Sequence, residues 1–417
     1  MNILLACAYV PYPPDTGGRT RGYHTLRYVS QHHRVHLLAF YHHPAERQHH
    51  DALASLCETV TLLPAPSWSQ GLLHRLGRAL YAPADVVIPR RSPPLAEALR
   101  HGIAQHAIDV VHLEELGWAG YAAALGDVPT VLVKQNVETS MWDSLAASKR
   151  WGSPGWALTS LEAGALRRWE GRAATCFCRV AVVSERDRAA LAALGCPRQR
   201  IAVVPNGVDT DYFTPVDVGQ VDNLSYKLVF TGALFWYPNV DTACWLARQI
   251  WPRVRAQEPA AELILVGREP ATPVQALAAV PGVVVTGTVP DVRPYLAAAT
   301  VVVAPGRVAG GARLKVLEAL AMGRAVVSTP VGAEGLDLAP GCELVVVDHA
   351  TPRADARRCG RRGAEAFADA VVALLRDPAR RARLGAAGRA AVVARYDWRV
   401  VLPALDEAYR EASRARE

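Results

Sequence analysis

Residues 304–336 read A-P-G-R-V-A-G-G-A-R-L-K-V-L-E-A-L-A-M-G-R-A-V-V-S-T-P-V-G-A-E-G-L. An apolar, β-branched run from Thr300 to Ala304 leads into the Pro- and Gly-rich turn at the start of this stretch. Strong helix formers follow from Arg313 to Met322, and Ala325 to Ser328 has the composition of another buried strand. The stretch therefore predicts a strand, a glycine-rich turn, a helix and a second strand, which is the order of α/β folds.

The amino end of the predicted helix carries an unusual set of charges. Arg313 and Lys315 lie in its expected first turn, where cations oppose the helix dipole and an anion would be stabilised. Two interpretations remain open. Lys315 and Glu318 form a surface pair while Arg313 reaches water, or Gly310, Gly311, Arg313 and Lys315 form a phosphate cradle with Glu318 one turn deeper, where it accepts hydrogen bonds from sugar hydroxyls.

This stretch, together with Val203-Val-Pro-Asn-Gly-Val-Asp209, resembles the donor half of glycosyltransferase family 4. The resemblance extends over nearly the whole chain. It implies an α/β chain with the GT-B fold, in which two Rossmann-like, doubly wound domains face each other across a cleft and a C-terminal helix crosses back to the first domain. The implied acceptor-side domain is 1–215 plus the helix 396–417, and the implied nucleotide-sugar donor domain is 216–395.

The bulk composition bounds the classes of protein and partner. A chain of 417 residues with 51% hydrophobic and 20% charged residues is long and apolar enough for two globular domains. A net charge of +7 fits a solvated surface, anionic nucleotide substrates or an anionic membrane face. The basic residues are spread out and match no nucleic-acid-binding motif, so we expect no nucleic acid partner.

Localisation is inferred from what the sequence lacks. We find no uninterrupted apolar segment of about 18 residues and no C-x-x-C pair, so we expect a reduced, cytoplasmic protein without a membrane-spanning helix. Residues 45–105 look irregular, but residues 68–80 combine helical apolar spacing with basic side chains. This segment either packs against its own domain or makes a peripheral contact with the inner membrane face.

The first half of the chain alternates strands and helices. Strands are expected at 2–8, 35–41, 109–113, 130–134, 179–183 and 201–204, with helices at 23–31 and 158–173 and a capped helix that starts after Ser184. Gly17-Gly18 does not fit the dinucleotide fingerprint G-x-G-x-x-G. In the family that this chain resembles, the corresponding loop approaches the donor diphosphate, which makes Gly18 and Arg19 candidate substrate contacts. The alternative is a loop glycine beside a solvated arginine.

Polar residues follow two of the expected strands at their carboxyl ends, the edge where α/β sheets bind ligands. The resemblance places Glu114 where family members commonly have a histidine that contacts the transferred sugar, so Glu114 is a candidate catalytic residue. Asn136 and Glu138 match an Asn-Val-Glu pattern of one branch and are candidate substrate contacts.

The second half repeats the β/α rhythm, with strands at 228–232, 262–267, 283–286 and 343–348 and helices at 241–257, 380–394 and 396–414. Many family members carry an Arg and a Lys in the loop after the first of these strands, but residues 233–239 contain no cation. We infer that Arg313 and Lys315 neutralise the diphosphate instead. Gly310 stands where the family's E-x7-E pattern has its first Glu, as in a subset resembling exopolysaccharide transferases.

The implied activity is metal-independent hexosyl transfer from a nucleotide-diphosphate sugar, with retention of anomeric configuration. The diphosphate would bind the N–H groups of Gly311 and Ala312, and the base would lie near Val289. No cofactor is expected, and Asp209-Thr-Asp211 is interpreted as a turn rather than a metal site. The acceptor is a glycan, a lipid-linked sugar or a small molecule. Two alternatives remain: an epimerase or phosphorylase of the same fold, and a non-catalytic nucleotide-sugar-binding scaffold.

Overall fold

The computed structural model describes residues 1–65, 93–149, 151–216, 226–308, 310, 313–348 and 356–414. The segment 68–80, for which a membrane contact was considered, lies outside these residues, as do Gly311 and Ala312. The chain divides into two compact units. The first comprises Met1–Asn206, Gly310–Ala312 and Val401–Glu417, and the second comprises Gly207–Ala309 and Arg313–Val400. The sequence had suggested boundaries after residues 215 and 395.

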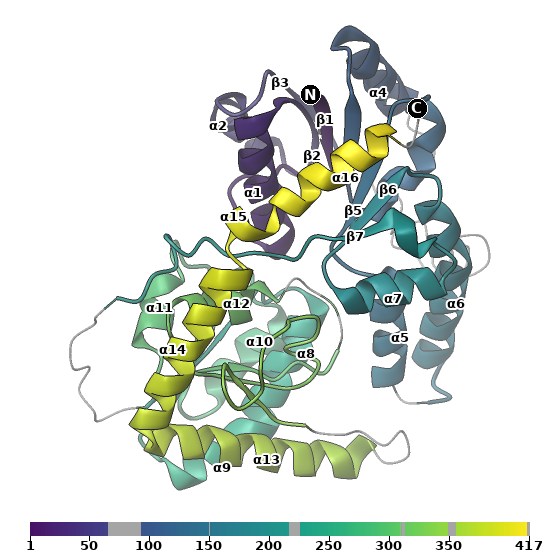
Figure 1. Cartoon of the computed structure of the whole chain (residues 1–417). Helices are drawn as coiled ribbons and strands as arrows, with labels where there is room; N and C mark the ends of the chain where they lie inside the picture. Colours follow the sequence, from purple (N-terminus) through teal and green to yellow (C-terminus); the bar gives the residue numbers. More distant parts are fainter. Residues whose placement is uncertain are drawn as a thin grey trace. The chain divides into compact units, whose positions relative to one another are not determined.

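The first unit is built on a seven-stranded parallel sheet with the order β3-β2-β1-β4-β5-β6-β7 (Figure 1). Its strands are β1 (Asn2–Cys7), β2 (Arg34–Tyr41), β3 (Thr59–Pro64), β4 (Val110–Glu114), β5 (Thr130–Lys134), β6 (Arg179–Val182) and β7 (Ile201–Val203). Six of the seven were predicted. The strand β3 was missed because it is a half-buried edge strand with a weak apolar pattern.

Helices connect these strands, as parallel pairing requires. They are α1 (Gly17–His32), α2 (His50–Ala54), α4 (Pro93–Gln105), α5 (Glu138–Ser148), α6 (Pro154–Ala174) and α7 (Glu185–Ala193). The helix α1 begins six residues before the predicted start, so Gly17 and Gly18 form its first turn and not a loop. The predicted cap of α7 is confirmed: the hydroxyl of Ser184 accepts a hydrogen bond from the Asp187 N–H at 3.1 Å.

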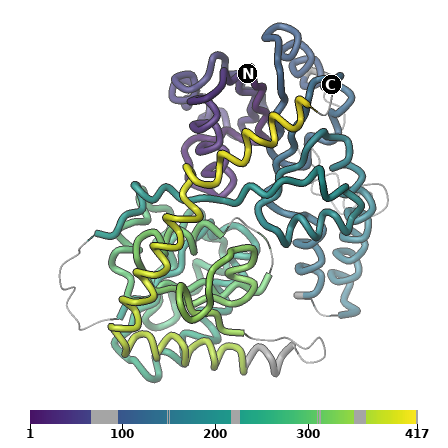
Figure 2. Tube along the Cα trace, viewed as in Figure 1, coloured from purple at the N-terminus to yellow at the C-terminus, as the bar shows by residue number. Residues whose placement is uncertain are grey.

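The C-terminal helix α16 (Pro403–Arg414) packs on the strands β4 to β7 of the first unit, which confirms the expected return of the chain (Figure 2). Tyr28 on α1 donates a hydrogen bond to Asp406 at 2.8 Å, and the Tyr409 hydroxyl lies 2.6 Å from the His112 ring. The predicted helix 396–414 is interrupted at Leu402, because Pro403 cannot continue the preceding short helix α15 (Trp398–Val401).

The second unit has a six-stranded parallel sheet with the order β10-β9-β8-β11-β12-β13. Its strands are β8 (Lys227–Thr231), β9 (Glu262–Val266), β10 (Val283–Gly287), β11 (Val301–Ala304), β12 (Val326–Ser328) and β13 (Val345–Val346). Its helices are α8 (Tyr237–Trp245), which continues through a π-helical turn into α9 (Trp251–Gln257), then α10 (Thr272–Gln275), α11 (Arg293–Ala298), α12 (Leu314–Ala321), α13 (Ala356–Arg376) and α14 (Pro378–Arg395). The long helix α13 was not predicted, because its first residues form a basic, Gly-containing run that resembles a loop.

The segment after β7 pairs with the chain just before α16, as Val208 forms a bridge with Asp397. The interpretation of residues 209–211 as a turn is confirmed, since Asp209 Oδ1 accepts hydrogen bonds from the N–H groups of Asp211 (3.2 Å) and Tyr212 (2.9 Å). Asp211 also forms an ion pair with Arg399 at 2.9 Å. Within the described ranges, no helix is both long and apolar enough to cross a bilayer, and no cluster of three metal-ligating side chains occurs.

Candidate functional site

The glycine-rich turn and helix from which the fold was inferred lie between β11 and β12, as predicted. Arg313, however, precedes α12 instead of lying in its first turn. It is the N-terminal capping residue and has a left-handed backbone (φ 54°), a conformation that a non-glycine residue rarely adopts. Its half-buried guanidinium lies 3.3 Å from the Glu334 carboxylate. The Gly332-Ala-Glu segment therefore supplies a partner for Arg313 that sequence reasoning did not assign.

Lys315 lies in the first turn of α12 and bonds to Asn239, not to Glu318. Its ammonium donates to Asn239 Oδ1 at 2.6 Å and lies 4.2 Å from the centre of the Phe230 ring. Asn239 Nδ2 donates to the Ala233 carbonyl at 2.9 Å, so the amide oxygen is held toward Lys315. Burial, reinforced by the charge of Arg313, lowers the pKa of Lys315 to about 7. The interpretation as a solvated surface pair is therefore wrong.

Glu318 lies one turn further along α12 and is half-buried. Its carboxyl group makes no hydrogen bond to another described residue, and burial raises its pKa to about 7 against the opposing effect of Lys315. A carboxyl group with this pKa can both accept and donate hydrogen bonds near neutral pH. That chemistry fits a pair of neighbouring sugar hydroxyls.

Two glycines at the carboxyl ends of β8 and β9 make room for the Lys315 ammonium. A Cβ on Gly232 would come within 2.9 Å of Lys315 Nζ, and its φ of 156° is unfavourable for any side chain. A Cβ on Gly267, which has a φ of 157°, would lie 1.7 Å from the Gly232 carbonyl oxygen. The close approach of these two turns therefore requires glycine at both positions.

The loops proposed to hold the nucleobase meet beyond the carboxyl ends of β9 and β10. The Glu269 N–H donates to the Thr288 hydroxyl at 3.3 Å, which joins the loop after β9 to the loop after β10. Val289 is half-buried in the second of these loops. Gly310 has a φ of 123°, which only glycine adopts readily, and it groups with the first unit. The roles of Gly310, Gly311 and Ala312 as a phosphate cradle stay predictions.

In the first unit, Gly18 packs closely against Tyr9 at the carboxyl edge of the sheet, which leaves little room for a side chain. A Cβ on Gly18 would approach the Tyr9 ring to 3.1 Å, and the Tyr9 hydroxyl accepts a hydrogen bond from Gln135 at 2.9 Å. Arg19 is not a solvated side chain: it pairs with Glu46 and lies 3.4 Å from Asp15. The charge of Arg19 is thus already compensated within this unit.

The structure buries Glu114 completely at the end of β4. Its Oε1 lies 3.1 Å from His112 Nε2, while its Oε2 has no hydrogen-bond partner among the described residues. The adjacent Glu115 has a left-handed backbone (φ 83°) and is only half-buried. Burial and the charge of Glu114 raise the pKa of Glu115 to about 7. Sequence reasoning missed Glu115; its position directly after a predicted strand was the one available signal.

Glu138 is committed to a buried ion cluster at the carboxyl end of β5. The Lys134 ammonium bonds to Glu138 and lies 2.9 Å from Glu170 on α6. Glu170 also accepts hydrogen bonds from the N–H groups of Glu138 (2.9 Å) and Thr139 (2.8 Å). Burial raises the pKa of Glu138 well above its usual range. Asn136, two residues earlier, is half-buried. The cluster fixes the start of α5 beside the predicted acceptor edge.

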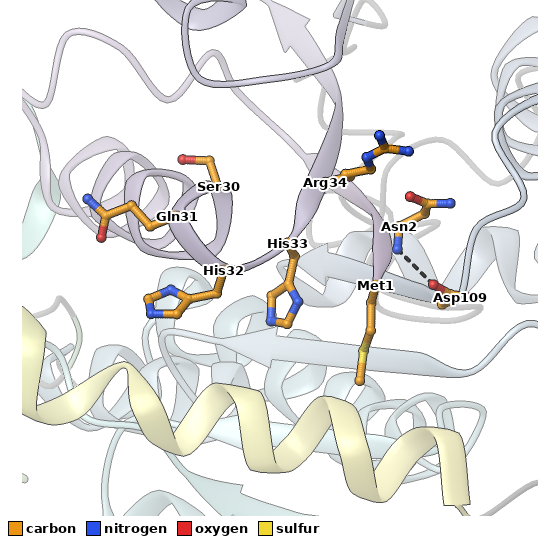
Figure 3. A pocket seen from close by; sticks show the side chains of 8 residues that line it. All are labelled: Met1, Asn2, Ser30, Gln31, His32, His33, Arg34 and Asp109. Atoms are coloured by element: carbon orange, nitrogen blue, oxygen red, sulfur yellow. Dashed lines mark hydrogen bonds between the residues drawn. The ribbon is translucent and has the colours of Figure 1, made fainter.

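A pocket in the first unit lies at the opposite end of the sheet, where β1 and β2 begin (Figure 3). The Asn2 N–H donates to Asp109 at 2.7 Å there, beside Arg34 and the His32–His33 end of α1. Because open α/β sheets bind their ligands at the carboxyl ends of the strands, we do not assign the substrate site to this pocket.

Comparisons with known proteins match both units. Residues 17–212 match the family described as Glycosyltransferase Family 4, and residues 225–377 match the family described as Glycosyl transferases group 1. A GDP-mannose-dependent alpha-(1-6)-phosphatidylinositol monomannoside mannosyltransferase from Mycobacterium tuberculosis is 28% identical over 360 residues, covering 81% of this chain and 85% of the relative.

Solved structures show the same fold along the full length. Sucrose-phosphate synthase from Thermosynechococcus elongatus aligns with a TM-score of 0.70 and 18% identity over 98% of both chains. HepE from Anabaena, in complex with UDP and glucose, aligns with a TM-score of 0.67 and 16% identity over 97% of this chain and 98% of that one. WaaG, a glycosyltransferase involved in lipopolysaccharide biosynthesis, aligns with a TM-score of 0.61 and 14% identity over 97% of this chain and 99% of that one. At such identities the likeness establishes the fold.

Proposed function

We propose that this chain, a family 4-like glycosyltransferase with two parallel-sheet units, transfers a hexosyl group from a nucleotide-diphosphate sugar to an acceptor hydroxyl with retention of configuration. The family matches and the GT-B neighbours support sugar transfer. We assign the donor site from one observation, the arrangement of Arg313, Lys315 and Glu318 at the start of α12.

The donor diphosphate would bind at the amino end of α12. Two cations at an electropositive helix end repel each other and oppose the dipole. Glu334 faces Arg313, whereas the hydrogen-bond partner of Lys315 is the neutral Asn239 amide, so a bound anion would stabilise Lys315 most. Burial lowers the pKa of Lys315, so a bound diphosphate would stabilise its charged form. Glu318, one turn deeper, would hold the ribose hydroxyls.

Bond breaking would be assisted without a metal ion. Cleavage of the sugar–phosphate bond builds negative charge on the leaving diphosphate, and fixed cations and N–H groups stabilise that charge best where water is scarce. Retention would follow from attack on the same face as the leaving group, which needs no protein nucleophile. Arg313 and Lys315 are the residues that would supply this stabilisation.

The comparisons suggest which substrates to try first. The mycobacterial relative is named for GDP-mannose and a phosphatidylinositol monomannoside, and HepE is named in complex with UDP and glucose. We therefore propose a GDP- or UDP-hexose as the donor and a lipid-borne sugar as the acceptor class.

A donor screen followed by a transfer assay tests the proposal. The purified chain is melted with GDP-, UDP-, ADP- and dTDP-sugars, where a true donor at a hundredfold excess over its Kd adds about 2.7 kcal/mol of stability. The stabilising donor is then incubated with glycolipid acceptors, and the anomeric configuration of the product is read by NMR. A donor that stabilises Lys315→Ala as strongly as the wild type would contradict the site. Release of free sugar or an epimerised nucleotide sugar without acceptor would contradict the reaction.

A further inference from the structure

Three polar side chains follow three adjacent strands at the carboxyl edge of the first sheet. Tyr9 comes after β1, Glu115 directly after β4 and Gln135 directly after β5, and these strands are neighbours in the sheet. The buried Gln135 amide donates to the Tyr9 hydroxyl at 2.9 Å, which holds the phenol in place. Burial, and then the charges of Glu114 and Glu115, raise the pKa of Tyr9 well above its usual range, so the phenol lies within electrostatic reach of both carboxyl groups. A carboxyl, a phenol and an amide group therefore gather where open α/β sheets bind ligands.

Glu115, and not Glu114, is the carboxyl group that a ligand at this edge can reach. Side chains alternate along a strand, so Glu114 shares one face of β4 with His112. The His112 ring lies between Glu114 Oε1 (3.1 Å) and the Tyr409 hydroxyl of α16 (2.6 Å), and all three of these side chains are completely buried. Glu115 is only half-buried, and its left-handed backbone (φ 83°) departs from the strand conformation. Its carboxyl group makes no hydrogen bond to another described residue, so it is available to a ligand.

The described cations near these strand ends already have partners. In the loops after the three strands and the first turns of α1, the described basic residues are Arg19, Arg21 and Lys134, the last residue of β5. Arg19 is bound by two acidic side chains of its own unit, and Lys134 belongs to the buried ion cluster. Arg21 is completely buried and donates to Asn206 Oδ1 at 2.8 Å and to two backbone carbonyls. This edge therefore offers a ligand a carboxyl group and no cation to bind an anion.

We propose that Glu115 binds a hydroxyl group of the acceptor, and that the acceptor ring which receives the hexosyl group is an uncharged sugar without a phosphate. The inference rests on the proposed function. The Glu115 carboxylate accepts a hydrogen bond from one hydroxyl of this ring. Tyr9, whose oxygen already accepts from Gln135, donates its own proton to a neighbouring hydroxyl.

The hydrogen-bonding groups of this edge distinguish a hydroxyl from a phosphate and from an amine. Glu115 offers an acceptor and Tyr9 a donor, and a hydroxyl group can satisfy both. An ammonium group has only donors, so the Tyr9 proton would be left without a partner. An ionised phosphate has only acceptors, and Glu114 and Glu115 would repel it with no free cation to offset the repulsion. Any phosphate of a lipid-borne acceptor would therefore lie away from the ring that reacts.

Acceptor kinetics with matched glycosides test this proposal. The stabilising donor is supplied to the full chain with an octyl glycoside of mannose or glucose, and with the same glycoside carrying a phosphate or an amino group. We expect the wild type to use the unmodified glycoside at least tenfold better, as kcat/KM, than either charged form. Glu115→Gln should raise KM for the unmodified glycoside about tenfold with a smaller change in kcat, and should narrow the discrimination against phosphate. Glu115→Lys should reverse that discrimination.

The matched control is Glu58→Gln, which removes a carboxylate at the opposite, amino end of the sheet, where Glu58 lies 3.8 Å from Arg34. This variant should keep the wild-type KM for every glycoside. Stabilisation of each variant by the nucleotide-sugar donor is measured in parallel, and a wild-type value shows that the variant folds and binds the donor.

Three outcomes would overturn the inference and leave the proposed function standing. These are a wild type that prefers the phosphorylated or the amino glycoside, a wild type that transfers only to an acceptor other than a sugar, and a Glu115→Gln variant with unchanged KM and unchanged discrimination. Absence of transfer to any acceptor, in a chain that the donor stabilises, would overturn the inference and the proposed function together.

Discussion

Donor affinity should fall steeply as the pH rises above 7, because the free protein then loses the proton of Lys315. Burial and Arg313 lower the pKa of this ammonium to about 7, and the charged form is the one that a diphosphate stabilises. Donor affinity should therefore be constant below the pKa that Lys315 has in the free protein and should decline above it. The decline ends only at the higher pKa that Lys315 has in the complex.

The size of the loss in affinity depends on how far the pKa of Lys315 rises from the free protein to the donor complex. A unit charge about 4 Å away, at an effective dielectric constant of about 20, contributes about 4 kcal/mol, or roughly three pKa units. The pKa of Lys315 in the complex would then lie well above 7, and affinity should drop about tenfold per pH unit above 7. Between pH 6.5 and 8.5 we expect a loss of about 20- to 30-fold.

Isothermal calorimetry with a nucleotide-diphosphate sugar measures this directly, since both phosphates stay ionised over the range. Asn239→Asp is the matched variant, because it replaces the amide oxygen 2.6 Å from Lys315 Nζ with a carboxylate that should raise the free pKa well above 7. Its affinity should be lower than that of the wild type but nearly flat from pH 6.5 to 8.5. Wild-type affinity that is unchanged across this range would refute the argument.

The remaining predictions concern single substitutions. Arg313→Ala should lower kcat/KM by about 10²–10³-fold, or 2–4 kcal/mol, through lost stabilisation of the leaving diphosphate; wild-type turnover would exclude that role. Glu318→Ala should weaken nucleotide binding in calorimetry, and Glu318→Gln less so; an unchanged Kd for both would remove the ribose contact. Glu170→Ala should destabilise the first unit by about 3–5 kcal/mol in urea, because it leaves Lys134 and two N–H groups buried with fewer partners. Gly267→Ala should prevent stable folding of the second unit, as judged by thermal melting, since its Cβ would overlap a carbonyl oxygen.

The central strands of both sheets could be predicted because they are buried, β-branched and bounded by turn residues. The strand β5 was predicted with its exact bounds, Thr130–Lys134. The prediction of strands and helices failed where an element is only partly buried or where its apolar residues occupy only part of its length. The edge strand β3 has a half-buried pattern, and α13 begins in a basic run whose apolar face appears only in its later turns. Such elements are fixed by tertiary contacts that a local pattern does not encode.

The charged residues of the candidate site were predictable as a group, but their partners were not. The position of Lys315 and Glu318 on one helix follows from sequence spacing. The contact of Lys315 with Asn239 joins residues 76 positions apart, and that of Arg313 with Glu334 joins residues 21 apart. These pairings depend on parallel strands that bring separate loops to one edge, which topology sets and local sequence does not.

Backbone strain marks the same edges in both units and gives an independent reason to place function there. Three of the four non-glycine left-handed conformations among the described residues lie at these edges, namely Glu115 after β4, Glu269 after β9 and Arg313 before α12, whereas the fourth, Ala107, precedes β4 at the amino edge. Each costs free energy that the surrounding structure must offset, and such strain is retained chiefly where a side chain has to be held in one direction. For Arg313 that direction is toward Glu334 and the start of α12. The same reasoning applies in the first unit to Glu115, whose strained backbone holds its side chain in one direction beside the buried Glu114.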